Sequence, residues 1–125
     1  MKYLPLLVLF LLPLGLIAQA KIDEPALKAL LAKDKSALVL DVRTAEEYAA
    51  GHLEKALLLP FDAIDAKTAA QFIPKKTTKV VLYCHSGRRS GLAAQTLKDL
   101  GYTNVLDFGA LSNWKGKLAT GAPPK

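Results

Sequence analysis

The chain alternates between two patterns of apolar residues. Short runs of consecutive apolar residues are typical of strands buried on both faces, whereas apolar residues three or four positions apart are typical of helices that cover such a sheet. The runs lie at residues 37–42, 56–60, 79–83 and 104–108. The helical pattern lies at residues 25–33, 44–51, 65–73 and 90–100. This alternation predicts an α/β domain with a mainly parallel central sheet of about four to five strands, flanked by helices.

Some residues indicate where these elements begin and end. Thr44 and Glu47 have the spacing of a capping box, in which two side chains satisfy free amide groups at a helix start. Gly51 follows at a position where helices commonly end. The remaining C-terminal segment, residues 109–125, is expected to be a loop with a short turn or helix around Trp114.

The N-terminal segment has a different pattern. Residues 1–20 contain a basic residue, Lys2, a leucine-rich run at residues 4–18 and an Ala-Gln-Ala sequence at residues 18–20. These are the features of a secretory signal peptide and its cleavage site. We therefore expect a signal peptide at 1–20 and one folded domain at 21–125.

An uncleaved membrane anchor is the alternative for this segment. The apolar run is near the lower limit of about 17 residues for a spanning helix, and Pro5 and Pro13 interrupt it. We expect cleavage, a periplasmic or secreted protein, and no stable association with a membrane after cleavage.

Composition and charge narrow the class of function. The chain has 125 residues, of which 51% are hydrophobic and 22% charged, and this suits a single globular domain. Its 17 basic and 11 acidic residues give a net charge of +6. The lysines are scattered, without interleaved aromatic residues or a basic arm, so nucleic-acid binding is not expected. The modest positive charge favours small anions as partners.

The only cysteine, Cys84, directly follows the predicted strand at 79–83, and Asp41 lies near the end of the strand at 37–42. In parallel sheets, ligands bind outside the carboxyl ends of the strands, so both residues fall at the functional edge. Secreted proteins normally pair their cysteines. An unpaired one is either a small buried apolar residue or a reactive thiol.

The loop after Cys84 has the composition of an anion cradle. Gly87 permits the backbone angles of a tight curl, and the helix that follows directs its positive end toward the loop. Further donors and charges come from Ser86, Arg88, Arg89 and Ser90. Such a cradle favours the thiolate of Cys84 and would stabilise a persulfide anion. His85 either lines the pocket or is an exposed non-catalytic side chain, and without a second ligand nearby it predicts no metal site.

Three motifs resemble the signatures of the rhodanese-like family, in the family's order. The first reads LDVR at 40–43, EEY at 46–48 and GHLEKA at 51–56, the second reads CHSGRRS at 84–90, and the third reads GY at 101–102 and FGA at 108–110. Together they span nearly all of the sequence after residue 20. Lys55 and Ala110 each stand where the family usually has glycine, which leaves the local turns in question.

The resemblance implies a three-layer domain and sulfurtransferase activity. Cys84 would take sulfane sulfur from a small anionic donor such as thiosulfate, hold it as a persulfide, and pass it to cyanide or another thiophilic acceptor, without a metal or organic cofactor. The backbone amides of residues 85–89 would surround the sulfur, and Arg88 or Arg89 would bind the donor. Asp41 and Arg43 would support the loop through ion pairs and hydrogen bonds. The implied substrate-binding residues are His85, Ser86, Gly87, Arg88, Arg89 and Ser90.

Two other functions fit parts of the pattern. Cysteine-dependent phosphatases and arsenate reductases also place a thiolate at the base of an anion-binding loop, but their signature is C-x5-R, whereas Cys84 and Arg89 are spaced C-x4-R. Arsenate reductases also use further thiols. A non-catalytic module could carry or bind sulfur on the same fold. Because the loop retains its cysteine, glycine, arginines and serine, catalysis is the simpler interpretation.

Overall fold

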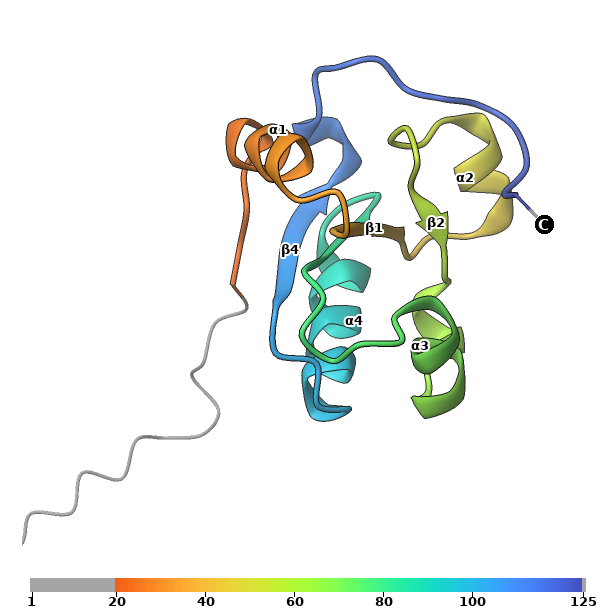
Figure 1. Ribbon diagram of the computed structural model, residues 1–125. Coiled ribbons are helices and arrows are strands. Elements are labelled where there is room, and N and C mark those ends of the chain that lie inside the picture. Colours follow the sequence, from red (N-terminus) through yellow and green to blue (C-terminus); the bar gives the residue numbers. More distant parts are fainter. Residues whose placement is uncertain (1–19, 125) are drawn as a thin grey trace, which may run out of the picture.

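The computed structural model describes residues 20–124, which form an α/β domain of three layers (Figure 1). Its helices are α1 (Glu24–Lys33), α2 (Ala45–Ala50), α3 (Ala66–Phe72) and α4 (Arg88–Asp99). Its strands are β1 (Leu38–Asp41), β2 (Leu57–Leu58), β3 (Val80–Cys84) and β4 (Val105–Ala110). Two short 3-10 helices are η1 (Phe61–Ala63) and η2 (Leu111–Asn113). The predicted fold class is confirmed.

The central sheet has the strand order β2-β1-β3-β4, and every pair of neighbours is parallel. The described part of the chain thus contributes four strands to this sheet, the lower end of the expected number. Asp41 is paired in register with Leu58 on one side and with Tyr83 on the other. The carboxyl ends of β1, β2 and β3 therefore meet at one edge of the sheet, where Cys84 follows Tyr83.

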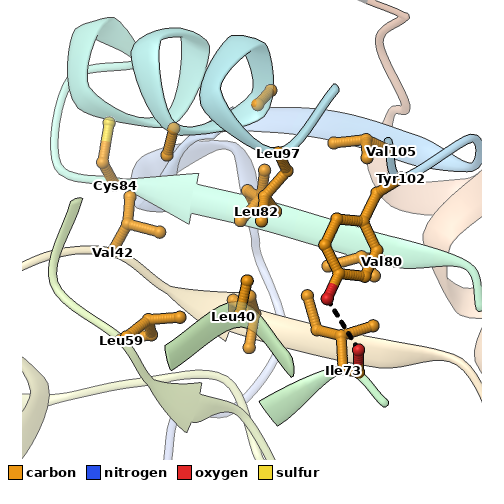
Figure 2. Close-up of a cluster of buried hydrophobic side chains, with 13 residues drawn as sticks. Leu40, Val42, Leu59, Ile73, Val80, Leu82, Cys84, Leu97, Tyr102 and Val105 are labelled. Atoms are coloured by element: carbon orange, nitrogen blue, oxygen red, sulfur yellow. Dashed lines mark hydrogen bonds between the residues drawn. The ribbon is translucent and has the colours of Figure 1, made fainter. Parts of the chain in front are cut away.

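Each face of the sheet has its own hydrophobic core, because successive side chains of a strand point to opposite faces. Leu40 and Leu82 belong to the cluster that β1 and β3 share with α3 and α4 (Figure 2). Val39, Val81 and Tyr83 belong to the other cluster, which includes side chains of α1 and α2. The helices consequently cover the sheet in pairs, α1 with α2 on one side and α3 with α4 on the other (Figure 1).

The helix starts follow local side-chain chemistry. The predicted capping box of α2 is present, since the Glu47 amide donates to the Thr44 hydroxyl at 3.2 Å. Helix α4, however, begins at Arg88, two residues before the predicted start at residue 90. The reason is Gly87, whose φ of +99° turns the chain into the helix at once. Arg88 and Arg89 therefore belong to the first helical turn and not to the loop.

The strand β4 runs to Ala110, beyond the predicted end at residue 108. A register shift after Leu82 leaves Phe108 as an extra residue on β4, so the strand bulges beside the end of β3. Gly109 takes the left-handed conformation at the bulge, with φ of +85°, whereas Ala110 has an ordinary φ of −78°. Alanine at position 110 therefore causes no backbone strain. The short helix η2 precedes Trp114, as predicted.

The chain enters the domain along the free edge of β4. The Asp107 amide donates to the Ala20 carbonyl at 2.8 Å, and the Ile22 amide donates to the Asp107 carbonyl at 3.1 Å. Apart from Ala20, the predicted signal peptide lies outside the described residues, and its cleavage stays a prediction. Within residues 20–124, none of the helices is both long and apolar enough to cross a membrane.

Lys55 provides a test of the turn before β2. It is the only non-glycine residue in the described chain with positive φ, at +67°, and the family that the sequence resembles usually has glycine there. A left-handed conformation costs an L-residue roughly 1–2 kcal/mol, and glycine avoids this cost. Part of the gain is lost because glycine loses more conformational entropy on folding. We expect Lys55→Gly to raise the free energy of unfolding by about 0.5–1 kcal/mol, as measured by urea denaturation.

Glu54→Gly is the matched control, because the neighbouring exposed residue has no positive φ to relieve. This variant should be less stable than the wild type. A Lys55→Gly protein that is no more stable than Glu54→Gly would contradict the strain at position 55.

Candidate active site

Cys84 is the last residue of β3, a strand whose five residues are all buried. The chain turns back over the next three residues, and the Gly87 amide donates to Cys84 Sγ at 2.9 Å. Helix α4 begins at the following residue. Figure 2 shows the sulfur directed from the end of β3 toward α4. The loop thus closes on the sulfur with a backbone N–H group at the positive end of a helix.

Ser90 completes the immediate surroundings of the sulfur. The Cys84 thiol donates to Ser90 Oγ across 3.5 Å, and Ser90 Oγ in turn donates to the Gly87 carbonyl at 3.1 Å. Ser90 is fully buried. Because a hydroxyl group can rotate, it can donate to the sulfur once the thiol has lost its proton. Both contacts of the sulfur therefore suit a negative charge at this position.

The sulfur is covered by the loop. Cys84 is 0% exposed, whereas His85 and Ser86 are exposed and Gly87 is half-buried. Burial by itself would also suit an inert cysteine, but the amide group aimed at the sulfur and the start of α4 distinguish this position from an ordinary core site. The sulfur therefore has no contact with solvent in this structure.

The two arginines in the first turn of α4 have different surroundings. Arg89 forms a bidentate ion pair with Glu47 of α2, at 2.8 Å to Oε1 and 2.9 Å to Oε2. Hydrogen bonding to Arg89 lowers the pKa of Glu47 from 4.5 to about 2. Arg88 is exposed and makes no ion pair with any residue between 20 and 124. Of the two predicted donor-binding arginines, only Arg88 has its charge free.

Asp41 and Arg43 form the buried ion pair expected of them. Arg43 Nη2 donates to Asp41 Oδ2 at 2.7 Å, and Arg43 Nε and the Arg43 amide each donate to Oδ1 at 2.9 Å. Arg43 Nη2 also donates to the Gly51 carbonyl at 2.6 Å. The pair therefore connects the end of β1 to the segment that follows α2.

Tyr83 extends this network to β3, next to Cys84. Its hydroxyl group donates to Asp41 Oδ2 at 2.8 Å and accepts the Leu53 amide at 3.1 Å. Burial, together with the charge of Asp41, raises the pKa of Tyr83, so the phenol stays protonated and keeps donating. Sequence reasoning did not identify Tyr83 as a site residue, because a tyrosine at the end of a buried strand has the pattern of a core residue.

Glu47 was likewise identified only as a capping residue. Its partner, Arg89, is 42 residues away in the sequence, and no local pattern indicates the contact. The one available signal was the second glutamate of the EEY motif, which the capping box already explained. The structure gives Glu47 both tasks, since its Oε1 accepts the Thr44 amide at 3.3 Å as well as Arg89.

A cavity of about 890 Å³ opens beside the loop. Its walls include Ser86 and Gly87, the end of β4 at Gly109 and Ala110, and the buried carboxylate-bearing residue Asp107. Cys84 does not line this cavity, whereas Gly87, whose amide donates to Cys84 Sγ, does. Among the described residues, no group of three or more metal-binding side chains is found.

Comparisons with known proteins agree with this geometry. The family model described as the rhodanese-like domain matches residues 24–117. The thiosulfate sulfurtransferase PspE of Escherichia coli is 35% identical over 74 residues, which cover 59% of this chain and 70% of that protein. YrkF of Bacillus subtilis, which bears the name "putative sulfur carrier protein", is 33% identical over 98 residues, 78% of this chain but only 51% of YrkF.

A solved structure gives the same result. The structure of a rhodanese with anions from Escherichia coli superposes with a TM-score of 0.61 at 33% identity, and the match covers 67% of this chain and 98% of that one. The shared part is therefore almost the whole of that rhodanese.

The Tyr83 hydroxyl group can be removed without changing the shape of the ring. In Tyr83→Phe, the buried Asp41 carboxylate loses a donor and the Leu53 amide loses its acceptor, so the free energy of unfolding should fall by about 1–3 kcal/mol. Tyr102→Phe is the matched control, because its buried hydroxyl group donates only to the neutral Ile73 carbonyl. Urea denaturation should show the larger loss for Tyr83→Phe. Equal losses would contradict the role of the charged partner.

The ion pair between Glu47 and Arg89 predicts a dependence of stability on pH. Because the folded state lowers the pKa of Glu47 to about 2, the stabilisation is complete above about pH 4.5 and is lost as the pH falls toward 2. The difference in unfolding free energy between the wild type and Glu47→Gln should therefore shrink over this range. Glu46→Gln removes a neighbouring exposed carboxylate and should show no such change. A pH-independent difference for Glu47→Gln would contradict the assignment.

Proposed function

This chain belongs to the rhodanese-like family, which includes thiosulfate sulfurtransferases, and on that premise we propose that it transfers sulfane sulfur through a persulfide on Cys84. The observation that carries the proposal is the Gly87 amide, which donates to Cys84 Sγ at 2.9 Å at the start of α4. A persulfide is a sulfur anion, and this loop offers it a backbone donor and the positive end of a helix.

The first half-reaction loads the cysteine. The Cys84 thiolate attacks the outer sulfur of thiosulfate, a bond forms between Sγ and that sulfur, and the sulfur–sulfur bond of thiosulfate breaks. Sulfite leaves with the electron pair of the broken bond. The product on the protein is a terminal persulfide anion, which the Gly87 amide and the Ser90 hydroxyl group stabilise.

The second half-reaction unloads it. The carbon of cyanide, or another thiophilic atom, attacks the terminal sulfur of the persulfide. The new bond completes thiocyanate, and the electron pair of the broken sulfur–sulfur bond returns to Cys84 as a thiolate. The two steps balance without an external oxidant or reductant.

The side chains of the loop have separate tasks in this proposal. Arg88 is exposed and unpaired within the described chain, so it attracts the anionic donor. His85 and Ser86 are exposed loop residues next to the buried Cys84, and in this proposal the loop moves as the donor enters. The similar rhodanese of Escherichia coli is described with anions, which supports an anionic substrate here.

One specific observation argues against a phosphatase. A phosphatase loop needs its final arginine directed at the oxygens of a bound phosphate, but both terminal nitrogens of Arg89 are bonded to Glu47. Sulfur carriage without turnover is the second candidate, favoured by the similarity to YrkF, of which this chain matches about half. A carrier would accept sulfur on Cys84 but would not produce thiocyanate catalytically.

The test is thiocyanate production from thiosulfate and cyanide by residues 21–125 and by the Cys84→Ala variant. We expect turnover by the wild type and its complete loss in the variant, because no other described residue can hold the sulfur as a persulfide. Circular dichroism of both proteins controls for folding.

A single equivalent of sulfur taken up without turnover would support the carrier function instead. A folded wild-type protein that neither produces thiocyanate nor takes up sulfur would contradict both functions for this donor.

A further inference from the structure

Glu47, a residue of α2, sets the net charge beside the cysteine loop. Arg88 and Arg89 bring two positive charges to the first turn of α4, but Glu47 reaches across from α2 and bonds to both terminal nitrogens of Arg89. The pair is partly exposed, with 25% of the Arg89 side chain and 30% of the Glu47 side chain accessible. One of the two positive charges is thereby neutralised where solvent anions can approach.

Arg89 lies in the first turn of α4, two residues after Gly87, whose amide donates to Cys84 Sγ. It precedes Ser90, whose hydroxyl group is 3.5 Å from Cys84 Sγ. The hydrogen bond with Glu47, together with the charge of that carboxylate, raises the pKa of Arg89. Both terminal nitrogens of the Arg89 guanidinium group are already bonded to Glu47, so they are not free to bind an anion.

We propose that Glu47 is a specificity-determining positioning residue. By bonding to Arg89, it leaves the site able to stabilise the single negative charge on Cys84 but weakens the binding of free sulfur oxyanions. This inference rests on the proposed function. Without the Glu47 carboxylate, the Arg89 guanidinium group could donate two hydrogen bonds to a bound oxyanion. Bidentate contacts of this kind are among the strongest hydrogen bonds in proteins. Thiosulfate would then bind more tightly, but so would the departing sulfite.

The role matters for turnover because donor and product resemble one another. A site with two free arginines would bind sulfite nearly as well as thiosulfate, and tight binding of product and substrate alike does not accelerate the chemical step. A site with one free arginine, Arg88, attracts the donor and still releases sulfite. Glu47 consequently lowers the affinity for the donor and speeds the release of sulfite.

The primary experiment measures binding of inorganic sulfate, which has the shape of the donor but cannot transfer sulfur. Isothermal titration at low ionic strength, where screening is weak, compares the wild type with Glu47→Gln. We expect sulfate to bind about tenfold more tightly to Glu47→Gln, equivalent to about 1.4 kcal/mol. Glu46→Gln, which removes an adjacent exposed carboxylate, should stay near the wild-type affinity.

The double variant Glu47→Gln/Arg89→Gln separates release of Arg89 from a simple loss of negative charge. If Arg89 is the new ligand, the double variant should lose the gain in affinity. Glu47→Ser is a second single variant with the same expected result, should Glu47→Gln fold poorly. Unchanged or weaker sulfate binding by folded Glu47 variants, or a gain that persists in the double variant, would overturn the proposal.

Steady-state kinetics give an independent measurement. Glu47→Gln should have a lower KM for thiosulfate, a lower kcat, and stronger inhibition by added sulfite. A purely structural role for Glu47 would lower stability and kcat without tightening either anion. Sulfate binding does not depend on sulfur transfer, so an inactive wild type would contradict the proposed function, whereas wild-type turnover with unchanged sulfate affinity in the variants would contradict this inference alone.

Discussion

The rest of the site depends on the ion pair and the hydrogen bonds of the buried Asp41 carboxylate. The carboxylate lies at the end of β1 with no exposed surface and accepts hydrogen bonds from Arg43 and from the Tyr83 hydroxyl group. Breaking a buried ion pair by removing one partner costs about 3–5 kcal/mol, a large share of the stability of a small domain. The network therefore fixes the ends of β1 and β3, and with them the position from which the cysteine loop departs.

Tyr83 and Cys84 are adjacent in β3, so the network that fixes the end of this strand also fixes the position of Cys84. Their side chains point to opposite faces, so the polar network occupies the side covered by α1 and α2 while the sulfur faces α4. Gly87 then directs its amide group to the sulfur and starts α4 in the same turn. A rigid strand end and a short left-handed turn are enough to place a helix N-terminus beside a thiol.

The sequence pattern predicted the elements well, because buried parallel strands and amphipathic helices have distinct periodicities. The motifs likewise indicated the turn at Gly87 and the ion pair of Asp41 and Arg43, which the structure contains, whereas the catalytic role of Cys84 stays a prediction. The early start of α4 was missed because it depends on the backbone angle of Gly87. The partners of Arg89 and Tyr83 could not be predicted, since both contacts join side chains 42 residues apart and only the folded sheet and helices bring them together.

The most direct test of the central claim is the mass of the intact protein after treatment with thiosulfate and removal of excess reagent. The account predicts a gain of one sulfur atom, located at Cys84 by peptide mapping, lost again on addition of cyanide and absent from Cys84→Ala. A folded wild-type protein whose mass does not change, or one that gains sulfur equally without Cys84, would contradict the assignment of this loop as a persulfide site.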